Sequence, residues 1–165
     1  MINNKIKSLG ALLKVIKKLK ANNSAKIVFT NGCFDIMHLG HVSYLEKAKS
    51  YGDILIVGLN SDASVKKIKG PNRPIQNENS RLGVLAALES VDYITLFNEP
   101  TPIRLIEAIK PNILVKGADW NIKDIVGNNI VKNNKGKVIK IKFIKGYSTS
   151  KIIERIIRGY SKKNK

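Results

Sequence analysis

Short runs of apolar residues alternate along the chain with longer segments in which apolar residues recur every three or four positions. Runs of the first kind are typical of strands buried on both faces, and segments of the second kind are typical of amphipathic helices. We expect strands at residues 26–30, 54–59, 93–97, 113–115 and 138–143. We expect helices at residues 41–50, 80–89, 101–109 and 148–157, with Pro102 close to a helix start.

The alternation of strands and helices predicts an α/β domain with a mostly parallel sheet and helices on both faces. Parallel neighbours need crossover connections, and these are almost always right-handed. Ligands of such sheets bind beyond the carboxyl ends of the strands. The polar segment 66–79 is long enough to form a mobile lid over that edge.

The two ends of the chain differ from its centre. Apolar positions within residues 8–20 follow a helical spacing, so residues 1–23 are expected to form a leader helix packed on the main domain. Residues 24–157 hold the strand–helix alternation, and 165 residues fit one ordinary domain. The basic stretch 158–165 is interpreted as a frayed tail.

The net charge of +18 attracts polyanions, but it does not choose among nucleic acid, a membrane surface and small anionic substrates. Lys, Ile and Asn are abundant from end to end, which indicates a drift in composition. A nucleic-acid-binding module needs a clustered basic face and exposed aromatic residues. With 6% aromatic residues, this module remains a distant alternative, and we expect neither a nucleic-acid nor a membrane partner.

A single cysteine, Cys33, leaves no internal disulfide and no zinc site built from cysteines. No stretch approaches the roughly 20 apolar residues of a membrane-spanning helix, and the amino terminus lacks the apolar core of a secretion signal. We therefore expect a cytoplasmic protein.

The segment that carries chemistry is TNGCFDIMHLGH, residues 30–41, where a strand ends and a glycine-containing turn leads into a helix. Gly40 lacks a side chain where the backbone comes close to another group, and His38 and His41 lie near the helix start. Two imidazoles there can donate hydrogen bonds to phosphate oxygens, and such bonds strengthen as charge develops in a phosphoryl transition state.

Other interpretations of the two histidines are a structural role and a metal site. Either one could be a helix cap or a partly buried polar residue. A metal site is disfavoured because the chain has no third histidine, no cysteine cluster and no His-Glu-x-x-His pattern. The segment also lacks the GxxxxGK[ST] of a P-loop and the GxGxxG of a dinucleotide fold.

The decamer GCFDIMHLGH closely resembles the His-x-Gly-His signature of the cytidylyltransferase-like nucleotidyltransferases. The segments VGLNSDASVKKIKGPNRPI, ALESVDYI, ILVKGADW and GYSTSKII resemble, in order and spacing, the branch of that family that adenylylates heptose 1-phosphate. The resemblance covers about residues 24–157 and implies a Rossmann-like, doubly wound fold.

Site residues follow from this resemblance one by one. It implies that His38, His41 and Lys116 act on the transferring phosphoryl group. The residues implied in nucleotide binding are Thr30, Asn31, Gly32, Phe34, Gly40, Gly117, Asp119, Ser148, Thr149 and Ser150. The residues implied in binding the acceptor phosphate are Asn60, Asp62, Lys69 and Arg73. Asp35 is expected to organise the turn; a water-mediated contact to magnesium is the alternative.

The resemblance also implies the reaction. An acceptor phosphate oxygen attacks the α-phosphorus of ATP in line, giving ADP-heptose and pyrophosphate, with Mg²⁺ carried by the nucleotide and no metal site on the protein. Cytidylyl transfer from CTP to glycerol 3-phosphate is the alternative, which the ADW sequence slightly favours. Branch members are often fused to a sugar kinase, so the resemblance implies a separate kinase upstream of this chain, and a homodimer is a family expectation.

Overall fold

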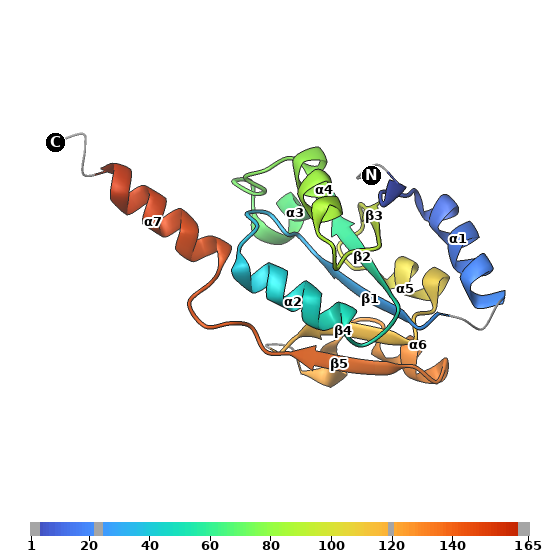
Figure 1. Cartoon of the computed structure of the whole chain (residues 1–165). Helices are drawn as coiled ribbons and strands as arrows, with labels where there is room; N and C mark the ends of the chain where they lie inside the picture. The colour runs from blue at the N-terminus through green and yellow to red at the C-terminus, as the bar shows by residue number, and fades with distance from the viewer. Residues whose placement is uncertain (1–3, 22–24, 119–120, 162–165) are drawn as a thin grey trace.

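The computed structural model describes residues 4–21, 25–118 and 121–161, and within them five parallel strands form a single sheet in the order β3-β2-β1-β4-β5 (Figure 1). The strands are β1 (Ile27–Gly32), β2 (Ile54–Asn60), β3 (Tyr93–Phe97), β4 (Ile113–Gly117) and β5 (Lys137–Ile141). The predicted α/β class, parallel sheet and Rossmann-like arrangement are confirmed.

Helices cover both faces of the sheet, because neighbouring residues of each strand point to opposite sides. The helices are α1 (Leu9–Ala21), α2 (Leu39–Lys49), α3 (Asp62–Lys69), α4 (Glu78–Ala87), α5 (Ile103–Ile109), α6 (Asn128–Asn133) and α7 (Thr149–Ser161), with a short 3₁₀ turn, η2, at Ile122–Asp124. Val28 of β1 packs in the core formed with α2 and α4. Its neighbour Phe29 packs in the core formed with α1, α5 and α6.

The chain reverses its direction across the sheet next to β1. It builds β1, β2 and β3 outward on one side, and then returns through α5 to β4, which pairs with β1 on the other side. A crevice at the carboxyl ends of the strands is expected at such a switch point. Here the crevice lies between the ends of β1 and β4.

The amino-terminal segment covers the outer edge of β3. Backbone bonds join the Ile94 N–H to the Lys5 carbonyl and the Lys7 N–H to the Ile94 carbonyl, both at 2.9 Å. Leu12 and Ile16 of α1 are buried in the core on one face of the sheet, so this helix packs on the strands. Covering the edge of β3 in this way pairs backbone groups that could otherwise form hydrogen bonds with a strand of another chain.

Several predicted bounds are wrong. The expected lid 66–79 begins within α3, so the loop proper spans residues 70–77. Helix α6 was not predicted, and the last strand ends at Ile141, two residues before its predicted end. The helix expected at 148–157 continues to Ser161, so the first four residues of the expected frayed tail are helical. Residues 162–165 lie outside the described part.

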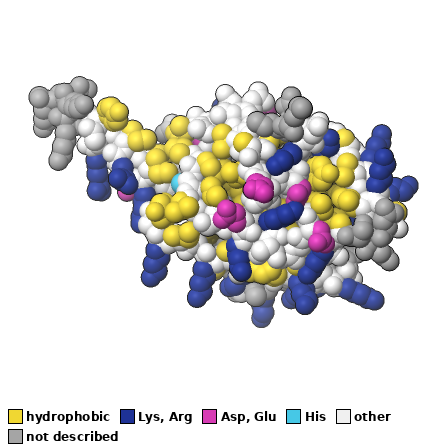
Figure 2. All heavy atoms as spheres, in the orientation of Figure 1, with side chains coloured by type: hydrophobic (Ala, Val, Ile, Leu, Met, Phe, Trp, Pro, Cys, Tyr) yellow, Lys and Arg dark blue, Asp and Glu magenta, His cyan; other side chains and the backbone are white. Residues whose placement is uncertain are grey.

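Helix α7 projects away from the sheet and its covering helices (Figure 1). None of the α7 side chains described in the structure is buried, and Ile156, Ile157 and Tyr160 are largely exposed. Lys and Arg side chains are spread over the face shown in Figure 2, without gathering into one patch. Within the described ranges, no helix is long and apolar enough to cross a membrane.

Candidate active site

The turn from β1 into α2 places both histidines at a helix start. His38 is the N-cap residue of α2, with extended backbone angles (φ −148°, ψ 169°), and its side chain makes no capping bond. Its carbonyl accepts from the N–H groups of His41 (2.8 Å) and Val42 (3.2 Å). The backbone therefore starts the helix, and the His38 imidazole is left for another role.

Gly40 lies at a tightly packed point of this turn. A Cβ built on Gly40 would lie 3.1 Å from the His38 ring and 3.3 Å from Cβ of Tyr147. The close approach expected from the sequence is therefore an approach to His38 and to the segment that leads into α7. A side chain at this position would crowd the His38 imidazole, which would have to shift by a few tenths of an ångström.

The two imidazoles are stacked on each other. Their centroids are 3.8 Å apart with the planes at 16°, and the Phe34 ring meets His41 edge-on at 5.3 Å. The Nδ1 atoms of both histidines are buried without a hydrogen-bond partner among the described residues. Burial lowers the pKa of His38, and it lowers the pKa of His41 to about 4, with a further contribution from His38. Both rings are therefore neutral at pH 7.

A cavity of about 330 Å³ opens in front of this turn, at the carboxyl ends of the strands. Its size is within the range of small-molecule sites. Predicted site residues among its lining are Asn31, Gly32, Phe34, His41, Asn60, Lys69, Lys116 and Gly117. The Lys116 ammonium, at the end of β4, donates to Oδ1 of Asn31 at the end of β1. This bond spans the crevice at the switch point.

Phe34 has a left-handed backbone, with φ 42°, which is unfavourable for a bulky side chain and is typical of functional turns. Its ring is buried and lies so close to Gly32 that a Cβ there would be 3.0 Å from Phe34 Cε2. The glycine at the strand exit therefore leaves room for the ring that contacts His41.

Thr30 lies beneath the cavity, fully buried. Its hydroxyl is 2.7 Å from the hydroxyl of Tyr44, which does line the cavity. The structure thus assigns Thr30 a supporting contact, and its predicted contact with nucleotide phosphates stays a prediction.

The predicted acceptor residues are divided between the cavity and its rim. Asn60 lines the cavity, is 3% exposed, and donates to the Ser64 hydroxyl at 2.9 Å. Lys69 reaches the cavity from the end of α3 and is exposed. Asp62 and Arg73 do not line the cavity, because each is held in an ion pair, with Arg81 and Asp35 respectively.

Asp35 ties the loop 70–77 to the histidine turn. Its carboxylate is 2% exposed and accepts from the Ile75 and Gln76 N–H groups at 2.8 Å and from Arg73 Nε at 2.6 Å. Burial alone would raise the pKa of Asp35, but the bonds from Gln76, Ile75 and Arg73 outweigh it and lower that pKa. The carboxylate is an organiser of the turn, as expected from the sequence.

Ser148, Thr149 and Ser150 are not brought to the cavity in this structure. They lie at the start of α7, where Ser148 Oγ accepts the Lys151 N–H at 3.2 Å as a cap. The adjacent Tyr147 contacts Gly40, so the hydroxyl residues begin one position beyond the histidine turn. Their contact with nucleotide stays a prediction.

Two further predictions concern Asp119 and the binding of metal ions. Asp119 lies outside the described residues. In the described ranges, no three His, Cys, Asp or Glu side chains are grouped so that they could hold a metal ion.

Sequence reasoning missed several residues of the site. Cys33, Tyr44 and Phe143 line the cavity, and Arg81 is buried beside it. Arg81 precedes Leu85 by four residues, on the face of α4 that packs inward, so a charge on an otherwise apolar helix face was the available signal. Phe143 follows β5 and lies 5.7 Å from the Tyr44 ring, a contact that no local pattern predicts.

Residues 29–155 match a family model described as Cytidylyltransferase-like. The chain is 52% identical over 156 residues to "Bifunctional protein HldE" of Geobacter metallireducens, covering 94% of this chain and 32% of that protein. It is 55% identical over 157 residues to the protein of the same name in Helicobacter acinonychis, covering 95% and 32%. The chain thus spans about a third of the length of these relatives.

Solved structures share the fold. A lipopolysaccharide core biosynthesis protein from Thermoplasma volcanium is 30% identical with a TM-score of 0.59, covering 76% of this chain and 100% of that one. Pantoate-beta-alanine ligase from Francisella tularensis, at 18% identity and a TM-score of 0.62, covers 95% of this chain and 78% of its own. The second likeness concerns the fold alone.

Proposed function

The chain belongs to the cytidylyltransferase-like family, and we propose that it is a nucleotidyltransferase that transfers AMP from ATP to heptose 1-phosphate, giving ADP-heptose and pyrophosphate. The observation that carries the chemistry is the stacked pair His38 and His41 at a helix start, of which His41 lines the cavity together with Lys116, while His38 lies behind it in the stack. Donors fixed before reaction stabilise the charge that develops on a transferring phosphoryl group.

The nucleotide phosphates bind at the crevice between β1 and β4, close to Asn31, Gly32, Phe34 and Gly117. A neutral imidazole carries one N–H group, and this group can donate a hydrogen bond to a phosphoryl oxygen. Lys116 supplies the positive charge at the cavity, and its contact with Asn31 holds it near the histidine turn. Negative charge then increases toward these donors as the bond to the leaving pyrophosphate lengthens.

The acceptor phosphate binds on the other side of β1, near Asn60 and Lys69. One of its oxygens attacks the α-phosphorus in line, a P–O bond to pyrophosphate breaks, and no covalent enzyme intermediate forms. Ser148, Thr149 and Ser150 reach the triphosphate only if α7 moves toward the cavity. Tyr147 lies beside Gly40, so these hydroxyl residues begin one position beyond a residue that already lies at the histidine turn.

Mg²⁺ belongs on the triphosphate. Mg²⁺ is a hard cation that prefers oxygen ligands, so it binds phosphate oxygens and offsets their negative charge. The polar side chains that line the cavity are mainly amides and ammonium groups, which do not form a carboxylate site for the ion.

The choice of ATP and heptose 1-phosphate is supported by the segments that resemble the heptose branch. Relatives that share about half of their residues with this chain carry the name HldE, and a structural neighbour acts in lipopolysaccharide core biosynthesis. A sugar kinase supplies the phosphorylated acceptor, and the enzyme works in the cytoplasm as a homodimer.

A pyrophosphate-release assay tests this proposal. Purified protein receives ATP or CTP with Mg²⁺, each with heptose 1-phosphate or glycerol 3-phosphate. We expect release that requires both substrates and is fastest with ATP and heptose 1-phosphate. Equal release without an acceptor would indicate hydrolysis and would count against transfer.

A further inference from the structure

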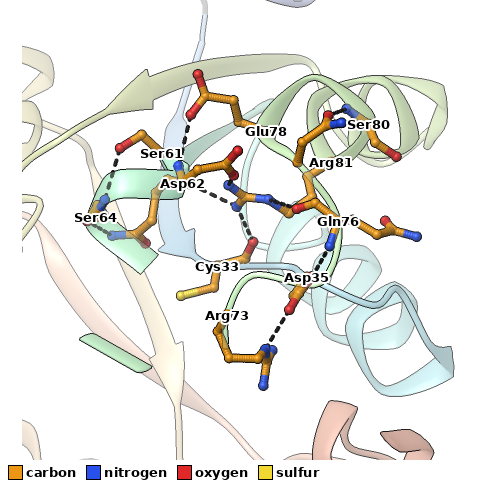
Figure 3. Close-up of polar contacts among 12 residues, drawn as sticks. Cys33, Asp35, Ser61, Asp62, Ser64, Arg73, Gln76, Glu78, Ser80 and Arg81 are labelled. Carbon is orange, nitrogen blue, oxygen red and sulfur yellow. Dashed lines mark hydrogen bonds and ion pairs between the residues drawn. The ribbon is translucent and has the colours of Figure 1, made fainter. Parts of the chain in front are cut away.

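Arg81 is a charged residue with 1% of its side chain exposed, buried beside the exits of β1 and β2 (Figure 3). It lies in the first turn of α4 and points toward the sheet. A guanidinium in such a place is stable only when its N–H groups and its charge are matched.

Four hydrogen bonds satisfy this guanidinium and join three separate segments. Nη1 donates to the Cys33 carbonyl at 2.6 Å and to the Asn60 carbonyl at 2.8 Å. Nε donates to the Gln76 carbonyl at 3.0 Å, and Nη2 pairs with Asp62 Oδ1 at 2.7 Å. The segments are the histidine turn, the exit of β2 and the loop 70–77.

Two carboxylates also bind backbone N–H groups of the β2 exit and of the loop 70–77. Glu78 accepts the Asp62 N–H at 2.8 Å, while Asp35 accepts the Ile75 and Gln76 N–H groups. The loop 70–77 is therefore fixed at its carboxyl end by α4 and by the histidine turn. The planar guanidinium has five N–H donors in a rigid fork, which suits it to four acceptors on three segments better than the three donors of a lysine ammonium.

We propose that Arg81 is a positioning residue: it fixes the β2 exit and the loop 70–77 relative to the histidine turn, and so orients the acceptor phosphate for attack. The inference rests on the proposed function, in which Asn60 lies on the acceptor side. The nucleotide crevice lies across β1, between β1 and β4. Among its described bonds, Arg81 meets that side only at the Cys33 carbonyl, whereas two bonds, to the Asn60 carbonyl and to Asp62, lie at the β2 exit. Arg81 is thus expected to govern the acceptor more than the nucleotide.

The kinetic test compares Arg81→Lys and Arg81→Met with Arg104→Met. Arg104 is an exposed arginine paired only with Glu99 among its described contacts, so it serves as the matched control. We expect kcat/KM for the acceptor to fall by about 100-fold in both Arg81 variants, because small misplacements of reacting groups have effects of that size. The dissociation constant of an unreactive ATP analogue should stay unchanged. A parallel loss of nucleotide affinity would overturn the inference.

Glu78→Ala provides a second route if the Arg81 variants fold poorly. It removes the acceptor of the Asp62 N–H from a half-buried position and leaves the core intact. We expect a weaker loss of the same kind, about tenfold in kcat/KM for the acceptor. Wild-type kinetics in a folded Glu78→Ala protein would contradict the proposal.

Hydrogen exchange separates this inference from the proposed function. In Arg81→Lys and Glu78→Ala, peptides covering 60–64 and 73–78 should exchange faster, while peptides of β4 and β5 keep wild-type rates. Unchanged exchange in the first set would overturn the inference whatever the substrates are. Faster exchange with unchanged kcat/KM would overturn the positioning role. A wild-type protein without transferase activity would reject only the proposed function and the acceptor assignment that is built on it.

Discussion

The imidazole of His38 stacks on that of His41, with centroids 3.8 Å apart and planes at 16°. This contact places two similar donors side by side at one helix start, where backbone amides also favour negative charge. Burial lowers the pKa of both rings, and the neighbouring His38 lowers the pKa of His41 further, so both rings are neutral at pH 7. The pair is therefore prepared for an anion and is not itself charged.

Replacing either histidine should lower turnover more than nucleotide affinity. His38→Ala and His41→Ala each remove a donor whose bond is strongest in the transition state. Each should lower kcat/KM by an amount equivalent to about 3 kcal/mol of transition-state stabilisation. Steady-state kinetics and calorimetric binding of an ATP analogue check this. Ser50→Ala, at the far end of α2, is the control, and near-normal turnover in both folded histidine variants would mean that the site is wrongly assigned.

The free energy of unfolding should decrease as the pH falls from 6.5 toward about 4. The pKa of His41 is about 4 in the folded protein and near 6.5 in the unfolded chain, so in this window only the unfolded chain binds the proton. Above pH 6.5 both states are neutral and His41 has no effect. The loss for His41 is up to about 1.4 kcal/mol per pH unit, and His38 acts in the same direction.

Urea unfolding at several pH values tests this dependence. The chain has only two histidines, and the lowered pKa of Asp35 moves its own titration below the window. His41→Gln should therefore flatten the slope between pH 6.5 and about pH 5. An identical slope in wild type and His41→Gln would show that burial does not perturb the imidazole.

The sheet could be predicted from the sequence because its strands are buried on both faces. Ile27, Val28 and Phe29 read as one apolar run, and each side chain does reach a core. Helix α3 could not be predicted in this way, since Val65 is its only buried apolar residue. It is stabilised at its start by the Ser61 side chain, which accepts the Ser64 N–H.

The site was predictable where its residues are close in sequence. His38, Gly40 and His41 lie within four positions, so their chemistry could be interpreted directly. The contact of Lys116 with Asn31 depends on β4 returning beside β1, which the order of strands along the chain does not reveal. Arg81 was missed for the same reason, because its partners at Cys33, Asn60 and Asp62 come together only in the folded sheet.

Replacing Lys116 should weaken catalysis through loss of charge. Lys116→Met roughly keeps the length of the side chain but removes the ammonium from the cavity wall. We expect kcat/KM to fall by an amount equivalent to about 2 kcal/mol of transition-state stabilisation. Lys137→Met, at the amino end of β5, is the matched control. Equal kinetics in the two variants would exclude Lys116 from the reaction.

Ser148 and Thr149, at the start of α7, have two possible roles that experiments can separate. If α7 closes on the cavity, Ser148→Ala and Thr149→Ala should weaken binding of an ATP analogue in calorimetry. If Ser148 only caps the helix, its loss should cost about 1 kcal/mol of local helix stability and leave affinity unchanged. Wild-type affinity in both variants would remove these residues from the nucleotide site.

Phosphorus NMR of the reaction products tests the central claim most directly. Protein, Mg²⁺ and ATP are incubated with heptose 1-phosphate, and parallel samples contain CTP or glycerol 3-phosphate in every pairing. We expect the ATP and heptose 1-phosphate sample to show equal amounts of free pyrophosphate and of a new pyrophosphate diester, ADP-heptose. A diester formed only from CTP and glycerol 3-phosphate would contradict the proposed substrates, and the absence of a diester from every pairing would contradict nucleotidyl transfer itself.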